Sequence, residues 1–282
     1  MSMTNTMRWR WAFGSGAAIL AAVAMQGPSQ AQNSAAPDFS GATIGWLAMG
    51  TDFKQAPGSP AIVVNDPARP HFGNGQGVQS SFRFADLNNP NLTDFAIAGL
   101  KKTNDEVARG KAVFSREARC WPTGVPTYDL NQAQPVYFVQ TPKEVTIMWQ
   151  MDHQVRHIYL NVPHSANPKP SWYGESVGHY EGDTLVVDTI GQNTQTYVDN
   201  YRTPHSEKLH VVERFHLTNE GKNLQAEIFV EDPATFKQPV KLIQTWRRVA
   251  QGPMAESSCA ESGPGFFDFD VEPIPTALKA DF

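Results

Sequence analysis

A series of short apolar segments separated by turns limits the fold of this chain more than any other feature. Eight such segments lie at 136–140, 145–150, 155–161, 176–180, 184–190, 209–218, 224–230 and 240–248. In most of them apolar residues alternate with polar ones, which places every second side chain on one face of a strand. The pattern predicts an antiparallel sheet whose strands are joined mainly by hairpins, as at Glu181-Gly182-Asp183.

A sheet of this size must protect its two edges, because unpaired edge strands invite association with other chains. Closure into a barrel and division into a sandwich are the two common solutions. The sequence therefore predicts a mainly β fold, either a lipocalin-like antiparallel barrel or a sandwich. A barrel of about eight strands has a mouth that holds one small ligand.

Composition and charge exclude several classes of protein. Hydrophobic residues make up 40% of the 282 residues, which is enough for a packed core and argues against intrinsic disorder. The net charge is -5, and the chain has no run of five Lys or Arg, so no nucleic-acid partner is expected. After the N-terminal segment no stretch approaches the roughly 18 apolar residues of a membrane span.

The N-terminal segment has the pattern of a signal peptide. Arg8 and Arg10 precede an apolar run at 17–25, and a Gly-Pro pair then leads to a small-x-Ala site that ends at Ala31. An N-terminal anchor helix is the alternative, but the run is too short to cross about 30 Å of hydrocarbon. We predict a cleavable signal peptide at 1–31 and a periplasmic or secreted protein.

The rest of the chain divides into three parts on the same evidence. Residues 32–134 form a loop-rich arm with one or two edge strands near 44–49 and 61–64, and with one amphipathic helix near 92–111. Residues 135–250 form the β domain. Residues 251–282 form a C-terminal tail.

Cys120 and Cys259 are the only cysteines. In an oxidising compartment a lone pair most often forms one disulfide, which is the prediction here. A nucleophilic thiol is the alternative. Two sulfurs without CxxC spacing make a poor zinc or redox motif.

Two charged residues fall on faces that alternation assigns to the interior. Glu213 shares its face with Val211 and Phe215, and Arg156 shares its face with Ile158 and Leu160. Because an unpaired buried charge costs several kcal/mol, we expect these two either to meet each other as a structural ion pair or to meet a ligand.

Histidines and aromatic residues near the turns supply further candidates. As acids or bases we consider His153, His179, His205 and Glu213, and Arg156 is the candidate for charge stabilisation. As substrate-binding residues we consider Tyr159, Trp172, Tyr180 and Asn193. No close triplet of His, Asp or Glu lies on one strand face, so no metal is predicted. The alternative to these functional roles is that the histidines are only solvated and the aromatic residues pack in the core.

Two blocks of sequence resemble a large family of exported bacterial proteins. They are ARCWPTGVP at 118–126 and GESVGHYEGDTLVVDTIG at 174–191, and the resemblance extends through 205–209, 212–215 and 232–233. It implies a secreted β-rich fold and carries no established reaction. Where the family commonly has Arg-Trp, this chain has His179-Tyr180, a change that adds acid–base groups.

The functional hypothesis combines these observations. GxGxxG, Walker and HExxH motifs are absent from the sequence, and its one GxSxG pattern, at 174–178, runs into a predicted strand and not into the strand-to-helix turn of a serine hydrolase. Neither a nucleotide cofactor nor serine-hydrolase chemistry is therefore expected. We predict a cofactor-independent lyase or isomerase that uses acid–base catalysis on a small aromatic or phenolic compound. A periplasmic binding or carrier protein without catalysis is the alternative, and an oligomer is compatible with either.

Overall fold

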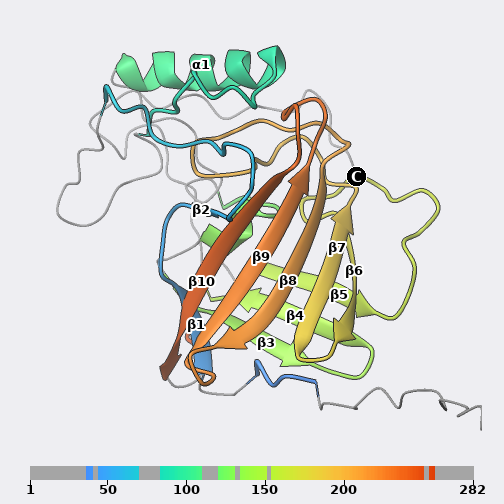
Figure 1. Cartoon of the computed structure of the whole chain (residues 1–282). Coiled ribbons are helices and arrows are strands. Elements are labelled where there is room, and N and C mark those ends of the chain that lie inside the picture. The colour runs from blue at the N-terminus through green and yellow to red at the C-terminus, as the bar shows by residue number, and fades with distance from the viewer. Residues whose placement is uncertain are drawn as a thin grey trace, which may run out of the picture. The chain divides into compact units, whose positions relative to one another are not determined.

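Nine strands of the described chain close into a barrel (Figure 1). The structure, a computed structural model, describes residues 36–40, 44–69, 83–109, 120–130, 134–150, 154–250 and 254–257. The barrel strands are β1 Ile44–Ala48, β3 Val136–Gln140, β4 Glu144–Trp149, β5 Gln154–Leu160, β6 Glu175–Glu181, β7 Thr184–Ile190, β8 His210–Thr218, β9 Asn223–Glu231 and β10 Val240–Ala250. The short β2, Lys54–Gln55, pairs with Leu242 and Ile243 of β10, on the same edge of β10 that β1 occupies further along. The barrel prediction is therefore confirmed, and the sandwich alternative is wrong.

Barrel closure comes from the first strand, in contrast to the prediction of an edge strand near 44–49. β1 pairs with β10 along its whole length, from Ile44 opposite Ala250 to Ala48 opposite Trp246. On its other side β1 meets β3, with Trp46 opposite Val136. The segment at 61–64 is not a strand, although Ile62 and Val63 are buried.

One pair of strands departs from the predicted antiparallel order. β5 and β6 are parallel, with Ile158 opposite Ser176 and Leu160 opposite Gly178. The Pro-rich residues 161–174 form a crossover segment that returns the chain before β6 starts, where a hairpin would have reversed it. Gly178 permits the close contact, since an added Cβ would lie 2.9 Å from the Val186 carbonyl oxygen and 3.0 Å from Ile158.

Aromatic rings fill one half of the barrel. Phe39, Phe138, Phe215 and Trp246 form a continuous line with ring centroids 5.5, 5.9 and 6.0 Å apart. Phe215 is the next inward residue after Glu213 on β8, in the direction of the β8–β9 hairpin. A packed aromatic layer thus lies on the β8–β9 hairpin side of Glu213.

The predicted helix near 92–111 is present as α1, Asp94–Ala108 (Figure 1). Thr93 caps it by accepting a hydrogen bond from the Ala96 N–H, which satisfies one of the free donors of the first turn. Its buried face includes Leu100 and Asn104, and the Asn104 side chain bonds both backbone groups of Ala85. The helix therefore rests on the loops at the barrel end and not on the strands.

Candidate functional site

Arg156 and Glu213 meet in the barrel interior. Arg156 Nη1 donates to Glu213 Oε1 over 2.8 Å, and Nη2 donates to Oε2, so the guanidinium grips both carboxylate oxygens. Both side chains are fully buried. Of the two outcomes left open by the sequence, the ion pair is the one that the structure shows.

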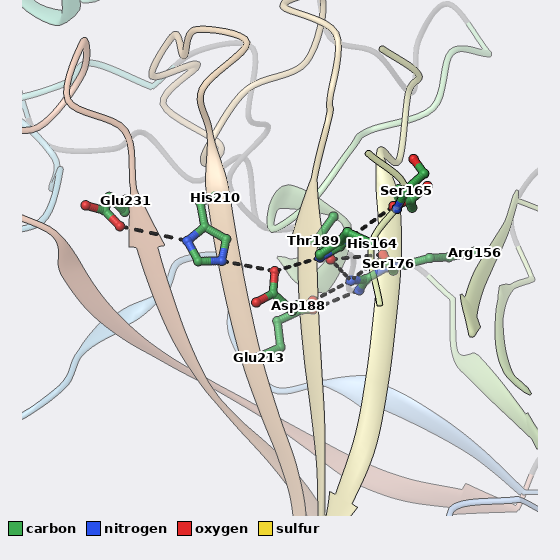
Figure 2. Close-up of polar contacts among 10 residues, drawn as sticks. Arg156, His164, Ser165, Ser176, Asp188, Thr189, His210, Glu213 and Glu231 are labelled. Atoms are coloured by element: carbon green, nitrogen blue, oxygen red, sulfur yellow. Dashed lines mark hydrogen bonds and ion pairs between the residues drawn. The ribbon is translucent and has the colours of Figure 1, made fainter. Parts of the chain in front are cut away.

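Two hydroxyl groups complete the surroundings of the guanidinium. Arg156 Nη2 donates to Thr189 Oγ1 over 2.9 Å, and Ser176 Oγ lies 3.3 Å from both Nε and Nη2. Ser176 and Thr189 also bond each other over 2.9 Å, as Figure 2 shows. The Arg156 charge is thereby shared among partners from β6, β7 and β8.

A second carboxyl group approaches the pair from outside the strands. Asp129 lies in the short helical turn η3, Thr127–Leu130, and the Gln244 side chain of β10 holds its backbone carbonyl over 3.0 Å. Burial, followed by the charge of Glu213, raises the pKa of Asp129 well above its usual range. Asp129 Oδ2 is buried and has no hydrogen-bond partner among the described residues. The raised pKa favours the protonated, neutral form of Asp129 beside the Glu213 carboxylate.

Tyr128 and Gln154 provide polar atoms beside this acid. The Tyr128 hydroxyl and Gln154 Nε2 are buried and accept or donate no hydrogen bond within the part of the chain that the structure describes. Tyr173 of the crossover segment packs edge-on against Tyr128, with ring centroids 5.6 Å apart, and donates to Gln154 Oε1. Burial, with Tyr173 next, raises the pKa of Tyr128 well above its ordinary value. We call Tyr128, Asp129, Gln154, Arg156 and Glu213 the interior cluster.

The other predicted residues near the barrel mouth lie in loops. His205 is buried, with Nε2 2.8 Å from Thr196 Oγ1 and Nδ1 2.9 Å from the Ser206 carbonyl oxygen. Trp172 packs against Trp121, with ring centroids 5.3 Å apart. Asn193 donates its backbone N–H to the Ser171 carbonyl. Hydrogen bonds between described residues join none of the three to Arg156 or Glu213.

Three further predicted residues lie away from the interior cluster. His179 is half exposed on β6 and pairs with Glu181 over 3.0 Å, and Tyr159 is 49% exposed on the outer face of β5. Tyr180 bonds Gln140 over 2.8 Å beside a groove of about 460 Å³ near the end of β5. Alternation explains the outward positions, because His179 and Tyr159 have the opposite parity to Ser176 and Arg156. The structure does not bring His179 and Tyr159 together with Arg156, and the proposed roles of all three residues stay predictions.

Two predicted residues cannot be placed. His153 and Cys259 lie outside the described residues. The acid–base role of His153 and the disulfide between Cys120 and Cys259 therefore stay predictions.

A second polar network, which sequence reasoning missed, lies on the outer face of the barrel. In Figure 2 the Asp188 carboxylate of β7 stands between two imidazoles, with His164 Nε2 at 3.1 Å and His210 Nε2 at 3.0 Å from its Oδ1. His164 Nδ1 lies 3.0 Å from Glu175, and His210 Nδ1 lies 3.8 Å from Glu231. The network ties the crossover segment, through His164, to β7.

Electrostatics within this outer network follow from its contacts. The hydrogen bond to Asp188 raises the pKa of His210, and the hydrogen bond from His210 lowers the pKa of Asp188. The Ser165 hydrogen bond lowers the pKa of Glu175. Among described residues, neither this network nor any other group of His, Cys, Asp and Glu has the arrangement of a metal site.

Alternation would also have placed Ser176 and Thr189 inside, since Thr189 shares its face with Leu185 and Val187. Tyr128 and Asp129 carry a weaker signal, because a four-residue turn has no periodicity to interpret. An acid flanked by Tyr128 and Leu130 in a loop was the available hint.

Comparison with protein-family models and with curated proteins gives no match. The described part of the chain contains no helix with the length and apolar character of a membrane span.

Proposed function

We propose that the chain is a cofactor-independent lyase or isomerase that acts on a small aromatic or phenolic compound, and that the interior cluster is its acid–base site. The observation that carries the proposal is the pair of Asp129 and Glu213, two buried carboxyl groups beside one arginine. A carboxylic acid kept neutral near pH 7 is able to give a proton to a bound substrate without competition from bulk water.

The proposed step uses one carboxyl group twice. Asp129 gives its proton to one atom of the substrate, and the resulting carboxylate removes a proton from a second atom, which restores the acid and leaves an isomer. While Asp129 is ionised, Arg156 stabilises the added negative charge. Glu213 stays bound to Arg156 and prevents Asp129 from ionising in the resting state.

The family resemblance and the N-terminal pattern support export of the protein, and an exported location is part of the proposal. Small plant-derived aromatic compounds are a suitable first panel, because Tyr128 and Tyr173 supply aromatic surface at the site. The panel is incubated with purified protein, with and without chelator, and products are separated by chromatography.

Asp129→Asn is the decisive variant for this proposal. It replaces a neutral acid with a neutral amide of the same shape, so the free energy of unfolding should change by less than about 1.5 kcal/mol while turnover is lost. Asp183→Asn, in the exposed β6–β7 turn, is the matched control and should retain full activity. Unchanged turnover in Asp129→Asn would refute the assignment.

A binding or carrier protein is the second candidate. The bidentate grip of Arg156 on Glu213 favours it, because both charges already satisfy each other and need no substrate. Binding of panel compounds without any turnover would select this candidate over the enzyme.

A further inference from the structure

The charges of the interior cluster cancel. Arg156 and Glu213 form an ion pair, and burial together with the nearby Glu213 charge favours the neutral form of Asp129. Each donor-bearing nitrogen of Arg156 already bonds Glu213, Ser176 or Thr189. A carboxylate or an ammonium group brought into this place would lose its hydration and find no opposite charge free to pair with it.

The polar atoms that remain open are uncharged. Within the described residues, Asp129 Oδ2, Gln154 Nε2 and the Tyr128 hydroxyl have no hydrogen-bond partner. Gln154 Nε2 is a donor, and the Tyr128 hydroxyl is both a donor and an acceptor. Their complement is one oxygen atom that accepts two hydrogen bonds. The hydroxyl of a phenol and the carbonyl of an aryl ketone both have such an oxygen.

Aromatic surface adjoins the open atoms. The Tyr173 hydroxyl donates to Oε1 of the same Gln154, and the Tyr173 ring contacts the Tyr128 ring edge-on. Tyr128 is buried, whereas Tyr173 is only partly buried and belongs to the crossover segment. Tyr173 therefore links the partly exposed crossover segment to the buried Tyr128 and Gln154.

We propose that Tyr128 and Gln154 bind the uncharged oxygen of a phenol or aryl ketone, and that the cluster rejects aromatic carboxylates and ammonium compounds of the same size. The inference rests on the proposed function only for the location of the site, and it names the ligand group that this site selects. A single water molecule held by the same two atoms is the competing occupant.

The test uses four probes that differ in one substituent: 4-methylphenol, 4-methylacetophenone, 4-methylbenzoate and 4-methylbenzylammonium. Binding to the full mature chain is measured by titration calorimetry at neutral pH. We expect the two uncharged probes to bind at least about tenfold more tightly than the two charged ones. A carboxylate that binds as tightly as the phenol would overturn the proposal.

Tyr128→Phe separates this site from non-specific adsorption. The variant removes a hydroxyl that has no partner among the described residues, so the fold should be retained, and affinity for 4-methylphenol should fall about threefold to tenfold. Tyr137→Phe on β3, which removes a hydroxyl bonded to Gln150, is the control and should bind as the wild type does. Equal affinity in Tyr128→Phe and wild type would also overturn the proposal.

The outcomes distinguish this inference from the proposed function. Selective binding without turnover of any panel compound supports the inference and refutes acid–base catalysis. Failure of all four probes to bind refutes the inference and assigns the open atoms to water, whereas turnover of another substrate would leave the catalytic proposal standing.

Discussion

A buried arginine and a buried glutamate stabilise a fold only while both are present. Arg156 and Glu213 are each fully buried, so removal of one leaves the other without compensation for its lost hydration. Removal of one partner destabilises the fold by more than the intact pair stabilises it. The reason is that burying the two charges costs hydration free energy, which offsets most of their attraction.

Glu213→Gln should therefore lower the free energy of unfolding by about 3 to 5 kcal/mol. The double variant Arg156→Met with Glu213→Leu should be more stable than Glu213→Gln, because it buries no unpaired charge. Urea unfolding followed by tryptophan fluorescence measures both. If Glu213→Gln unfolds at the same urea concentration as the wild type, the guanidinium has another partner and the pair is not a brace.

Alternation along β5 and β8 was sufficient to predict that both side chains point inward. It was not sufficient to predict that they meet, because β6 and β7 lie between the two strands in the sheet. The distance between them depends on the curvature of the barrel, which no local pattern contains. The position of Asp129 beside this pair could not be predicted either, because η3 lies in a segment without the alternating pattern of a strand.

The crossover segment is attached to the neighbouring strands through contacts between a histidine and two carboxylates. His164 is its contact with β6 and β7, and Asp188 is shared between His164 and His210 (Figure 2). An imidazole with carboxylates at both nitrogens is fully satisfied only when it carries two N–H groups. A doubly protonated His210 has a carboxylate at each ring nitrogen, Asp188 at 3.0 Å and Glu231 at 3.8 Å.

The outer network predicts a stability window in pH. The raised pKa of His210 gives a stabilising contribution that is present below the ordinary histidine pKa and is lost as the pH rises through the raised value. The lowered pKa of Asp188 gives a contribution that is present above the ordinary aspartate pKa and is lost as the pH falls through the lowered value. The two contributions overlap between about pH 4 and 6.5.

Asp188→Asn should therefore be less stable than the wild type mainly inside that window, by up to about 1 kcal/mol because the groups are partly exposed. Thermal unfolding of both proteins across the pH range measures the difference. Asp183→Asn is the control. A difference that stays constant from acid to alkaline pH would show that the carboxylate acts through packing and not through its histidine partners.

Strand assignment from the sequence succeeded because each hairpin keeps the period of two on both sides of a tight turn. Gly182, with its positive φ of 63°, is one such turn. The parallel pair of β5 and β6 was missed because a Pro-rich segment between two strands says nothing about the side of the sheet on which the chain returns. His164 was one of eight histidines in the sequence, and only the folded crossover sets it apart from the others.

Two processing steps are predicted for the whole molecule: removal of residues 1–31 and formation of one disulfide. We expect the exported protein to begin at Gln32 and the Cys120 and Cys259 peptides to be joined under non-reducing conditions. Intact-mass and peptide mass spectrometry of the secreted fraction test both points. Two free thiols, or a mature chain that keeps residues 1–31, would contradict the respective prediction.

The pairing of β1 with β10 also determines when the molecule is able to fold. A nascent chain emerges with its N-terminus first, so β1 has no partner on that side until nearly the whole sequence has been synthesised. Contacts between such distant segments require a large loop-closure entropy and make folding slow. A polypeptide whose barrel cannot close before its last strand is synthesised remains unfolded for longer, which suits transport through a secretion channel that accepts only unfolded chains.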